Sequence, residues 1–542
     1  MSLSPIDVVV VVAYAIFIFG LAQYVSREKA GHVKDTSDYF LASKSLPWWA
    51  IGASLIAANI SAEQIVGMSG SGYAMGLAIA SYEWMAALTL LIVGKYFLPI
   101  FLANKIYTMP QFLEQRYGKV LPVLMAVFWL ALYVFVNLTS IIWLGSIAVR
   151  NVAGIDQGYA LVALGLFALL YQLWGGLKAV ALTDIVQVTL LVLGGLVVSY
   201  LTLAEIGDGA GVIAGFQKLT ATVPGHFDMI LSPDNKYYVD LPGIAVLVGG
   251  MWIANLSYWG FNQYIIQRAL AAKNIGEAQK GVVFAAYLKL LMPVIIVLPG
   301  IAAVMLAPAL ATKDDAYPTM MRLLPPGLLG LVFAALIAAI IASTASKINS
   351  IATIFTLDLY AKARGIATRG EDGTGGEGQE KHLVLIGRCV AAVAIIIAII
   401  AAKPLLGGAD QAFQFIQEFS GFFTPGITVI FLLGLFWKKA TEAGAIAAAV
   451  TSVLLSFMLK KVIPIAGLPQ GVNDWLFPFM NRMLFVFLVS LALAMAISLL
   501  FPARKEKNVV SMEGVSFKTP NVFNVAGVGV ILILIALYAT WW

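Results

Sequence analysis

The chain has 542 residues, of which 61% are hydrophobic and 11% are charged, whereas an ordinary soluble domain carries roughly 25% charged residues. So little charge excludes a water-soluble globular protein and indicates a chain that lies in a membrane. The formal net charge of +6 does not indicate nucleic-acid binding, because the basic residues gather in the segments between apolar runs.

The apolar runs predict an all-α polytopic membrane protein with fourteen transmembrane helices. Each helix needs roughly 20 apolar residues to cross a hydrocarbon core about 30 Å thick, and backbone amides in lipid must be bonded within their own helix. The runs are apolar on every face, which excludes the alternating strands of a membrane barrel. In chain order the predicted helices are 4–26, 47–72, 79–103, 121–149, 158–176, 179–204, 242–267, 281–308, 328–360, 383–402, 411–437, 441–459, 479–502 and 523–541.

The charges around these runs predict the orientation of the chain. The first run follows MSLSPID, which holds no basic residue, and precedes Arg27 and Lys29. This is the reverse of a signal peptide, so the run is expected to remain as a helix. With the N-terminus outside, the inner segments hold most of the 34 lysines and arginines. The excess of basic residues inside predicts a bacterial inner-membrane protein with both termini on the outer side.

Two long loops lie between the predicted helices. The outer loop 205–241 is rich in glycine, aspartate and proline and is expected to fold over the entrance. The inner loop 370–381 reads GEDGTGGEGQEK and contains a formal G-x-G-x-x-G pattern. Because no strand precedes this pattern and no Lys-Ser pair completes a phosphate-binding loop, it is interpreted as a flexible linker.

Polar side chains concentrate in the second and seventh predicted helices, at depths where they are costly and therefore functional candidates. The second helix holds AANISAEQIVGMSGSGY (57–73) and the seventh holds ANLSYWGFNQYIIQR (254–268). These glycine-interrupted segments cross the membrane in opposite directions, as do the broken helices around the central site of inverted-repeat transporters. Close helix packing would explain the small residues but not Asn59, Gln64 and Asn255, so the segments predict a binding site.

Three further polar side chains can complete a site for a sugar, namely Glu83, Lys289 and Gln417 in the third, eighth and eleventh helices. Sugar hydroxyls are both donors and acceptors, which amides, a carboxylate and an ammonium can satisfy together. An anion is disfavoured because Glu83 would repel it, and another small neutral solute is the alternative. Flat faces for the sugar ring, or thin gates, are offered by Tyr82, Tyr258, Trp259 and Phe413.

The ninth predicted helix indicates a cation site, because its segment AALIAAIIASTASKINS (334–350) carries Ser343, Thr344 and Ser346 among alanines. Hydroxyls, together with carbonyls freed at the broken segment 57–60, are the oxygen ligands that sodium requires. A serine that bonds back to its own helix is the alternative interpretation. Asp184, near the start of the sixth helix, fits an ion exit path or a proton relay.

An enzyme is not predicted. The single cysteine, Cys389, excludes an internal disulfide, and His32, His226 and His382 fall in loops or at helix ends. Without paired histidines or cysteines at membrane depth, there is no basis for a haem, a metal cluster or another prosthetic group. A channel is disfavoured as well, because the polar residues occur singly and form no repeated rings.

Three segments resemble the sodium/solute symporter family: SLPWWAIGASLIAANISAEQ (45–64), YQLWGGLKAVALTDIVQ (171–187) and QAFQFIQEFSGFFTPG (411–426) followed by LLGLFWKKAT. The likeness covers most of the chain and is closest to members that carry galactose or glucose. It implies sodium-coupled sugar import by alternating access and a leucine-transporter-like fold with an inverted five-plus-five repeat. The implied parts are an extra helix and loop at 1–46, a first repeat at 47–204, an outer loop at 205–241, a second repeat at 242–437 and three extra helices at 438–542.

Carried over position by position, the resemblance implies a role for each candidate. Sugar contacts would come from Asn59, Gln64, Glu83, Asn255, Lys289 and Gln417. Tyr258 would be an inner gate stacked on the sugar, and Met68, Tyr82 and Phe413 would be an outer gate. Sodium would be held by the carbonyls of Ala57, Ile60 and Ala339 and the hydroxyl of Ser343, with Ala342 at a further ligand position and Asp184 on the exit path.

Two positions depart from the family pattern. Ala86 stands where sugar-carrying members have a serine that contacts the sugar, and Ala342 stands where the family usually has a hydroxyl ligand to sodium. Lys347 follows Ser343 by four positions and so lies one helical turn, about 5.4 Å, nearer the inner side. Its ammonium would either pair with Asp184 and make transport partly proton-coupled, or reach the inner membrane surface.

The expected partners are a small sugar, the sodium ion as the transported coupling ion, and membrane lipid. The chain is expected to be a monomer or a loose homodimer, with no nucleic acid and no prosthetic group.

Overall fold

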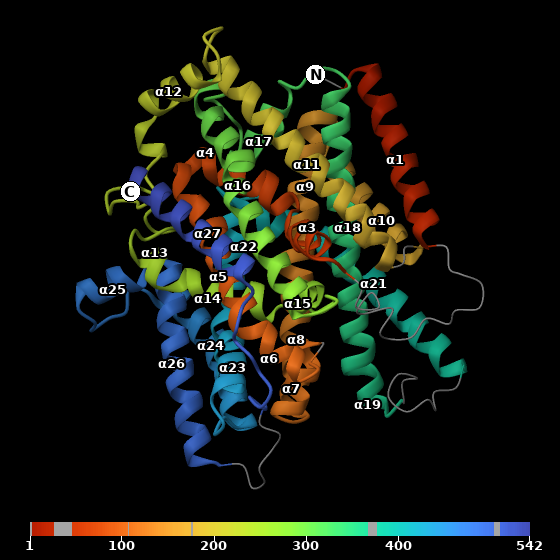
Figure 1. Cartoon of the computed structure of the whole chain (residues 1–542), viewed down its shortest axis with the longest axis vertical. Coiled ribbons are helices and arrows are strands. Elements are labelled where there is room, and N and C mark those ends of the chain that lie inside the picture. Colours follow the sequence, from red (N-terminus) through yellow and green to blue (C-terminus); the bar gives the residue numbers. More distant parts are fainter. Residues whose placement is uncertain (1–2, 27–45, 107, 175–176, 367–376, 503–509) are drawn as a thin grey trace.

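The computed structural model describes residues 3–26, 46–106, 108–174, 177–366, 377–502 and 510–542. Helices supply almost all regular structure in these ranges, and Leu46 and Ala272 form an isolated bridge. Figure 1 shows the helices gathered into one bundle, with α12 at one end and α7 and α19 at the other. Most of the inner loop 370–381 lies outside the described residues, and its end is not a linker, because α21 begins at Glu377.

The helices follow the predicted runs closely. The first half of the chain holds α1 Pro5–Ser26, α3 Trp48–Asn59, η2 Glu63–Met68, α4 Ser69–Met75, η3 Gly76–Ala80, α5 Ser81–Ile92, η4 Val93–Phe97, α6 Leu98–Ala103, α7 Met109–Arg116, α8 Val120–Ala131, η5 Leu132–Leu138, α9 Thr139–Ala153, α10 Gln157–Trp174, α11 Leu177–Ile206, α12 Val212–Thr222, η6 Pro224–His226, α13 Ala245–Val248, α14 Gly250–Phe261 and α15 Gln263–Leu270. The second half holds α16 Ile275–Leu306, η7 Lys313–Asp315, α17 Ala316–Met321, α18 Leu328–Thr353, η8 Ile354–Ala361, α19 Lys362–Arg364, α21 Glu377–Leu406, α22 Ala412–Ser420, α23 Thr424–Phe436, α24 Glu442–Val462, α25 Gln470–Leu476, α26 Phe479–Leu500 and α27 Asn521–Thr540.

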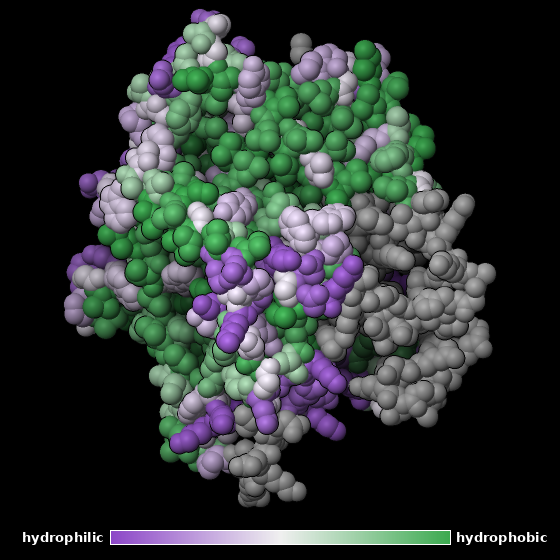
Figure 2. All heavy atoms as spheres, in the orientation of Figure 1, coloured by the Kyte–Doolittle hydropathy of each residue, from purple (hydrophilic) through white to green (hydrophobic). Residues whose placement is uncertain are grey.

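The chain is a multi-pass membrane protein. Among the described residues, nine helical stretches are long and apolar enough to cross a membrane, and α22 with α23, bent by 44°, would make a tenth. Fewer stretches than the fourteen predicted runs meet this criterion, because α1 and α10 have shorter apolar parts and α3 and α14 are pieces of interrupted helices. Figure 2 shows hydrophobic side chains over most of one face, with hydrophilic ones gathered around α12 and in the lower middle.

Both predicted helix breaks are present. Helix α3 ends at Asn59, and Ile60 takes the extended conformation with φ −68° and ψ 115° before the wider turns of η2 begin. Helix α14 ends at Phe261, and Asn262 is likewise extended, with φ −86° and ψ 121°. At each break the regular helical hydrogen bonds stop, so polar backbone groups become available inside the protein.

Helix α16 brings its polar residues to the first break because it packs along α3, α4 and α5. Glycine permits this approach, since a Cβ atom on Gly52 would lie 2.5 Å from the ring of Phe284 and 2.8 Å from the carbonyl oxygen of Gly281. Small residues at such contacts are the usual way in which membrane helices come close. The side chain of Lys289, near the middle of α16, is thereby buried.

Two peripheral segments are fastened to this bundle. The carboxylate of Asp7 on α1 accepts hydrogen bonds from the amides of Gly327 and Gly330, at 2.7 and 2.8 Å, at the start of α18. Negative charge is favoured at this end of a helix. The outer loop 205–241 contains α12 and η6, and His226 lies so close to Gly76 that a Cβ there would be 2.2 Å from the His226 carbonyl oxygen.

Candidate functional site

A cavity of about 120 Å³, here called the main cavity, lies between the two broken helices. Residues of α3, η2, α5, α14, α16 and α22 form its walls, so segments far apart in the sequence meet there. All six predicted sugar contacts line it, namely Asn59, Gln64, Glu83, Asn255, Lys289 and Gln417. Their individual roles stay predictions, while their convergence on one cavity is a finding.

A buried ion pair forms one wall of the main cavity. The Nζ atom of Lys289 lies 2.5 Å from Oε2 of Glu83, and the two residues are 1% and 3% exposed. Lys289 also donates a hydrogen bond to Oδ1 of Asn59, and its ammonium lies 4.9 Å from the centre of the Trp259 ring. Two charges taken out of water are tolerated only with good geometry and additional hydrogen bonds. This wall therefore presents fixed polar groups of both signs to a ligand.

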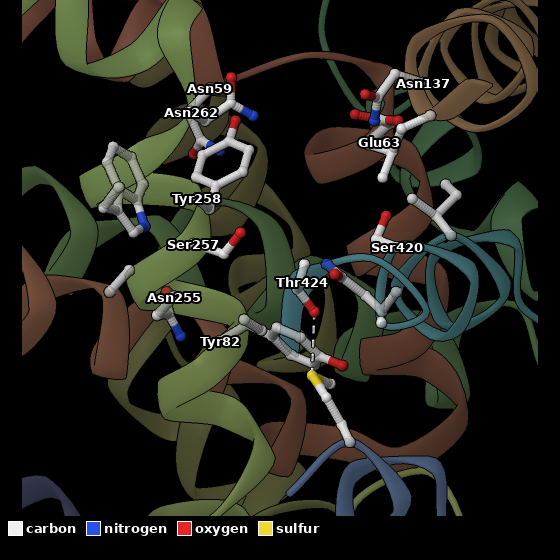
Figure 3. A pocket seen from close by; sticks show the side chains of 18 of the residues that line it. Asn59, Glu63, Tyr82, Asn137, Asn255, Ser257, Tyr258, Asn262, Ser420 and Thr424 are labelled. Atoms are coloured by element: carbon white, nitrogen blue, oxygen red, sulfur yellow. Dashed lines mark hydrogen bonds between the residues drawn. The ribbon is translucent and has the colours of Figure 1, made fainter. Parts of the chain in front are cut away.

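Tyr258 stands beside this wall. Its phenol oxygen accepts a hydrogen bond from Nδ2 of Asn59 at 3.0 Å and another from the hydroxyl of Tyr264 at 2.8 Å. The rings of Tyr258 and Trp259 meet edge to face, 5.1 Å apart. In Figure 3 Tyr258 lies next to Asn59 and Asn262, at the level where both helices are broken. Its role as an inner gate stays a prediction.

The opposite wall contains residues to which the sequence analysis gave no role. Glu63 accepts hydrogen bonds from Ser140 and, at 3.5 Å, from Ser61. Figure 3 shows Glu63 and Asn137 together, across the cavity from Tyr258. Glu63 could have been found from the polar run 57–73, whereas Asn137 lies with Thr139 and Ser140 in the otherwise apolar run 121–149, and these three residues were given no role. The further lining residues without an assigned role include Leu132, Ser257, Asn262, Ser420, Thr424, Ile427, Phe479, Met480 and Met483.

Aromatic rings line the main cavity at the predicted outer gate. The rings of Tyr82 and Phe413 meet edge to face with their centres 5.2 Å apart, and both line the cavity. Met68 is 1% exposed but does not line the cavity, so two of the three predicted outer-gate residues border it. Phe479, Met480 and Met483 of α26 also line the cavity, and this helix lies outside the predicted second repeat.

Two carboxyl groups near the cavity lie outside the membrane-spanning segments. Burial raises the pKa of Asp314 on η7 to about 8, with further contributions from Asp315 and Asp410. Oδ2 of Asp314 accepts a hydrogen bond of 3.2 Å from the amide of Ala412, the first residue of α22. Burial, followed by the charges of Glu418 and Asp410, raises the pKa of Asp240 to about 6. Asp314 therefore joins a loop to α22 through a titratable group.

A second, smaller cavity contains part of the predicted sodium site. Of the predicted ligands, Ala57, Ala342 and Ser343 line this small cavity, while Ile60 and Ala339 do not. Ile60 is instead the first extended residue of the helix break. Asp184 lies on α11, and its side chain is outside the described residues. The other lining residues are Ala58, Tyr264, Arg268, Ser346 and Lys347.

The arrangement suits recognition of hydroxyl groups and gives no sign of a transition-metal site. Within the described ranges, no three His, Cys, Asp or Glu side chains are placed to share a metal ion. The main cavity combines amides, a carboxylate, an ammonium and flat rings, which can bind a neutral polyhydroxyl molecule on its edges and faces. The small cavity offers hydroxyl and carbonyl oxygens near a helix break, which are the ligands that a sodium ion uses.

Comparisons with known proteins agree with this geometry. The model of the sodium:solute symporter family matches residues 39–452. The chain is 49% identical to the sodium/glucose cotransporter of Vibrio parahaemolyticus, over 100% of this chain and 99% of that protein. It is 32% identical to the sodium/myo-inositol cotransporter 2 of Sus scrofa, over 88% of this chain and 71% of that protein. A substrate-bound, outward-open Na⁺-coupled sialic acid symporter is 21% identical with a TM-score of 0.74, over 93% of this chain and 99% of that chain, and so supports the fold.

Proposed function

We propose that this chain, which belongs to the sodium:solute symporter family, imports galactose or glucose together with sodium by alternating access. The observation that carries the proposal is the buried cluster of Lys289, Glu83 and Asn59 in the main cavity. Charged groups at membrane depth are expensive and therefore mark a substrate path. Because the two charges are paired, the cavity favours a neutral ligand with many hydroxyls over an ion.

The likeness to a named relative supports the choice of sugar. The Vibrio parahaemolyticus relative, 49% identical along the whole chain, carries the name sodium/glucose cotransporter. A cyclic polyol is the second candidate, because relatives from Sus scrofa and Homo sapiens, each 32% identical, are named sodium/myo-inositol cotransporter 2. Ala86 lines the main cavity and offers no hydrogen bond from its side chain, which makes its position a candidate for discriminating between these solutes.

The proposed sodium ligands are the carbonyl oxygens of Ala57, Ile60 and Ala339 and the hydroxyl of Ser343. The lining of the small cavity by Ala57 and Ser343, next to the break at Ile60, supports this assignment. Ala342 offers no side-chain oxygen where the family pattern expects one. Asp184 is proposed to serve the exit path.

The architecture proposed for this function has fourteen transmembrane helices and two inverted repeats of five, at 47–204 and 242–437. The matching positions of the two interrupted helices, α3 with η2 and α14 with α15, support it. The excess of basic residues between the predicted inner ends supports an inner-membrane location with both termini outside. In Figure 1 the two termini and α12 lie toward the same side of the bundle, away from α7 and α19.

Uptake into proteoliposomes made with the full-length protein tests the function. Labelled galactose, glucose, myo-inositol and proline are offered under an inward sodium gradient, an equal potassium gradient, or a proton gradient without sodium. We expect accumulation of galactose or glucose under the sodium gradient and little under potassium. Equal uptake under the sodium and potassium gradients would overturn sodium coupling. Faster uptake of proline than of the sugars would overturn the sugar site. Sugar uptake driven by the proton gradient alone would indicate partial proton coupling.

A further inference from the structure

Lys347 carries a positive charge into the small cavity. It lies on α18 one turn after Ser343, is 7% exposed, and lines the cavity together with Ala57, Ala342 and Ser343. Such burial excludes the simple interpretation that Lys347 reaches out to the inner membrane surface. The pairing with Asp184 is not tested, because that side chain lies outside the described residues.

Among the described residues, the contacts of Lys347 within the small cavity are made with the uncharged side chain of Tyr264. Its ammonium donates a hydrogen bond of 3.4 Å to the hydroxyl of Tyr264 and lies 4.5 Å from the centre of the same ring. Of the described side chains that line the small cavity, none is a carboxylate. The charge of Glu63 acts on Lys347 from the main cavity, but Glu63 does not line the small one. A sodium ion entering this cavity would therefore meet like charge.

A chain of hydrogen bonds joins Lys347 to the main cavity. Lys347 donates to the hydroxyl of Tyr264, and that hydroxyl donates to the oxygen of Tyr258 at 2.8 Å. From the other side Asn59 donates to the same oxygen at 3.0 Å. Asn59 in turn accepts a hydrogen bond from Lys289. Tyr258 therefore accepts hydrogen bonds from two donors. Tyr264 is linked to Lys347 in the small cavity, and Asn59 is linked to Lys289 in the main cavity.

The position of Lys347 thus affects both the ion and the gate. An ammonium next to Tyr264 polarises its hydroxyl and so strengthens the hydrogen bond that it donates to Tyr258. When another cation enters the cavity, electrostatic repulsion drives Lys347 from this position, and the support of Tyr258 weakens. Coupling of this kind needs an element that both sites bias, and Tyr258 receives a hydrogen bond from Tyr264 on one side and from Asn59 on the other.

We propose that the Lys347 ammonium is a tethered cation that alternates with transported sodium in the small cavity and, through Tyr264, holds Tyr258 against the main cavity when sodium is absent. The proposal rests on the proposed sodium-coupled sugar transport and deepens it. In the absence of sodium, Lys347 keeps the inner gate closed and prevents the sugar from crossing alone. Lys347 acts here as a positioning residue, since it works on the sugar through Tyr264 and Tyr258.

The test compares Lys347→Met with the parent in proteoliposomes, using labelled galactose or glucose, whichever the parent accumulates faster. Two quantities are measured: the sodium concentration for half-maximal uptake, and sugar exchange without sodium. Removing the competing charge is expected to lower the sodium half-saturation about tenfold, within the usual range of coupling between sites. It is also expected to raise sodium-free exchange, because the gate loses its support. A merely structural lysine would not yield tighter sodium binding on removal.

Three variants control this experiment. Lys461→Met makes the same substitution at an exposed position on α24 and is expected to match the parent. Lys347→Arg keeps the charge and is expected to keep the parental sodium half-saturation. Tyr264→Phe keeps the ring under the ammonium but removes the hydroxyl between Lys347 and Tyr258, so it is expected to raise sodium-free exchange with the sodium half-saturation unchanged.

The outcomes separate this proposal from the function on which it rests. A parent protein without sodium-dependent uptake would overturn the proposed function itself. A sodium-dependent parent whose Lys347→Met variant has the sodium half-saturation of Lys461→Met would overturn the tethered cation. If Lys347→Met fails to fold, the decision passes to Tyr264→Phe, and parental sodium-free exchange in that variant would overturn the link to the gate.

Discussion

The main and small cavities each contain a buried lysine, but they surround it differently. Lys289 in the main cavity has Glu83 at 2.5 Å and a hydrogen bond to Asn59, whereas Lys347 in the small cavity has the hydroxyl and ring of Tyr264. An ammonium paired with a carboxylate stays in place when a neutral ligand enters. An ammonium held by a neutral phenol can be displaced by another cation. The difference makes the main cavity suitable for a sugar and the small cavity suitable for an exchange of positive charge.

The largest effect on sugar uptake is expected from Lys289→Met, which removes the lysine of the buried ion pair with Glu83. This change leaves Glu83 without its partner in the wall that is expected to contact the sugar, and removing one partner of a buried charge pair at a binding surface costs about 2–5 kcal/mol, so sugar uptake should fall about 100-fold. Uptake is measured in proteoliposomes that contain equal amounts of inserted, folded protein, with Lys461→Met as the control. Gln64 also lines the main cavity, and Gln64→Ala is expected to act in the same direction. Near-parental uptake in both would remove the sugar site from this cavity.

The next effect separates two neighbouring hydroxyls on α18. Ser343 lines the small cavity, while Thr344 is fully buried and donates a hydrogen bond of 2.7 Å to the carbonyl of Ile340 in its own helix. Ser343→Ala should raise the sodium half-saturation about tenfold, equivalent to about 1.4 kcal/mol. Thr344→Ala should leave it near the parental value. Equal sodium half-saturation in the two variants would place the ion elsewhere.

A smaller, pH-dependent effect is expected at the proposed outer side, where Asp314 joins η7 to α22 through the amide of Ala412. Burial holds the pKa of this carboxyl at about 8, whereas a solvent-exposed aspartate has a pKa of about 3.9. The Asp314 carboxyl therefore binds a proton more tightly while it is buried against Ala412 than when this contact opens and water reaches it. Its proton-linked stability is fully present below about pH 3.9, declines as the pH rises to about 8, and changes no further above that.

This linkage predicts that external sugar binds more weakly at low pH, because fewer molecules have their outer side open. The sugar half-saturation should fall severalfold between pH 6 and pH 8, and Asp314→Asn, which cannot ionise, should remove that dependence. Asp240, with a pKa of about 6, titrates mainly in the lower part of this range, so the comparison between pH 7 and pH 8 is the decisive one. The same pH profile in Asp314→Asn and the parent would contradict the prediction.

The smallest effect is expected from Ala86→Ser, which adds a hydroxyl to the wall of the main cavity. One added hydrogen bond is worth about 0.5–1.5 kcal/mol, so the half-saturation for galactose should fall about threefold. Competition between labelled galactose, glucose and myo-inositol measures the change in preference. An unchanged order and strength of competition would show that position 86 does not contact the solute.

The sequence predicted the polar walls better than the apolar ones. Asn59 and Gln64 belong to a polar run inside a predicted helix and Lys289 stands alone in an apolar one, and the cost of burying all three points to a shared site. Met480 and Met483 carry no such signal, because an apolar residue in an apolar helix has the same pattern whether it faces lipid or a cavity. The helix breaks were predictable from polar, glycine-rich segments, but the extended conformation at Asn262 depends on packing that hydropathy does not describe.

Position along a helix explains why the surroundings of Lys347 were only partly predictable. Its spacing from Ser343 predicted that the two side chains lie together, and both line the small cavity. The contact with Tyr264 joins residues 83 positions apart in the sequence. Such a contact depends on how side chains from two helices distant in the sequence, α15 and α18, meet in the folded protein, which no local pattern specifies.

Reciprocal binding measurements show whether a sugar in the main cavity is coupled to a cation in the small cavity. The dissociation constant for the sugar is measured on purified full-length protein with and without saturating sodium chloride, with choline chloride keeping the ionic strength constant. The dissociation constant for sodium is then measured with and without the sugar. Both constants should fall by the same factor, about 5- to 150-fold, because coupling between two sites is reciprocal. A sugar dissociation constant that is the same in sodium chloride and in choline chloride would contradict coupling between the two cavities.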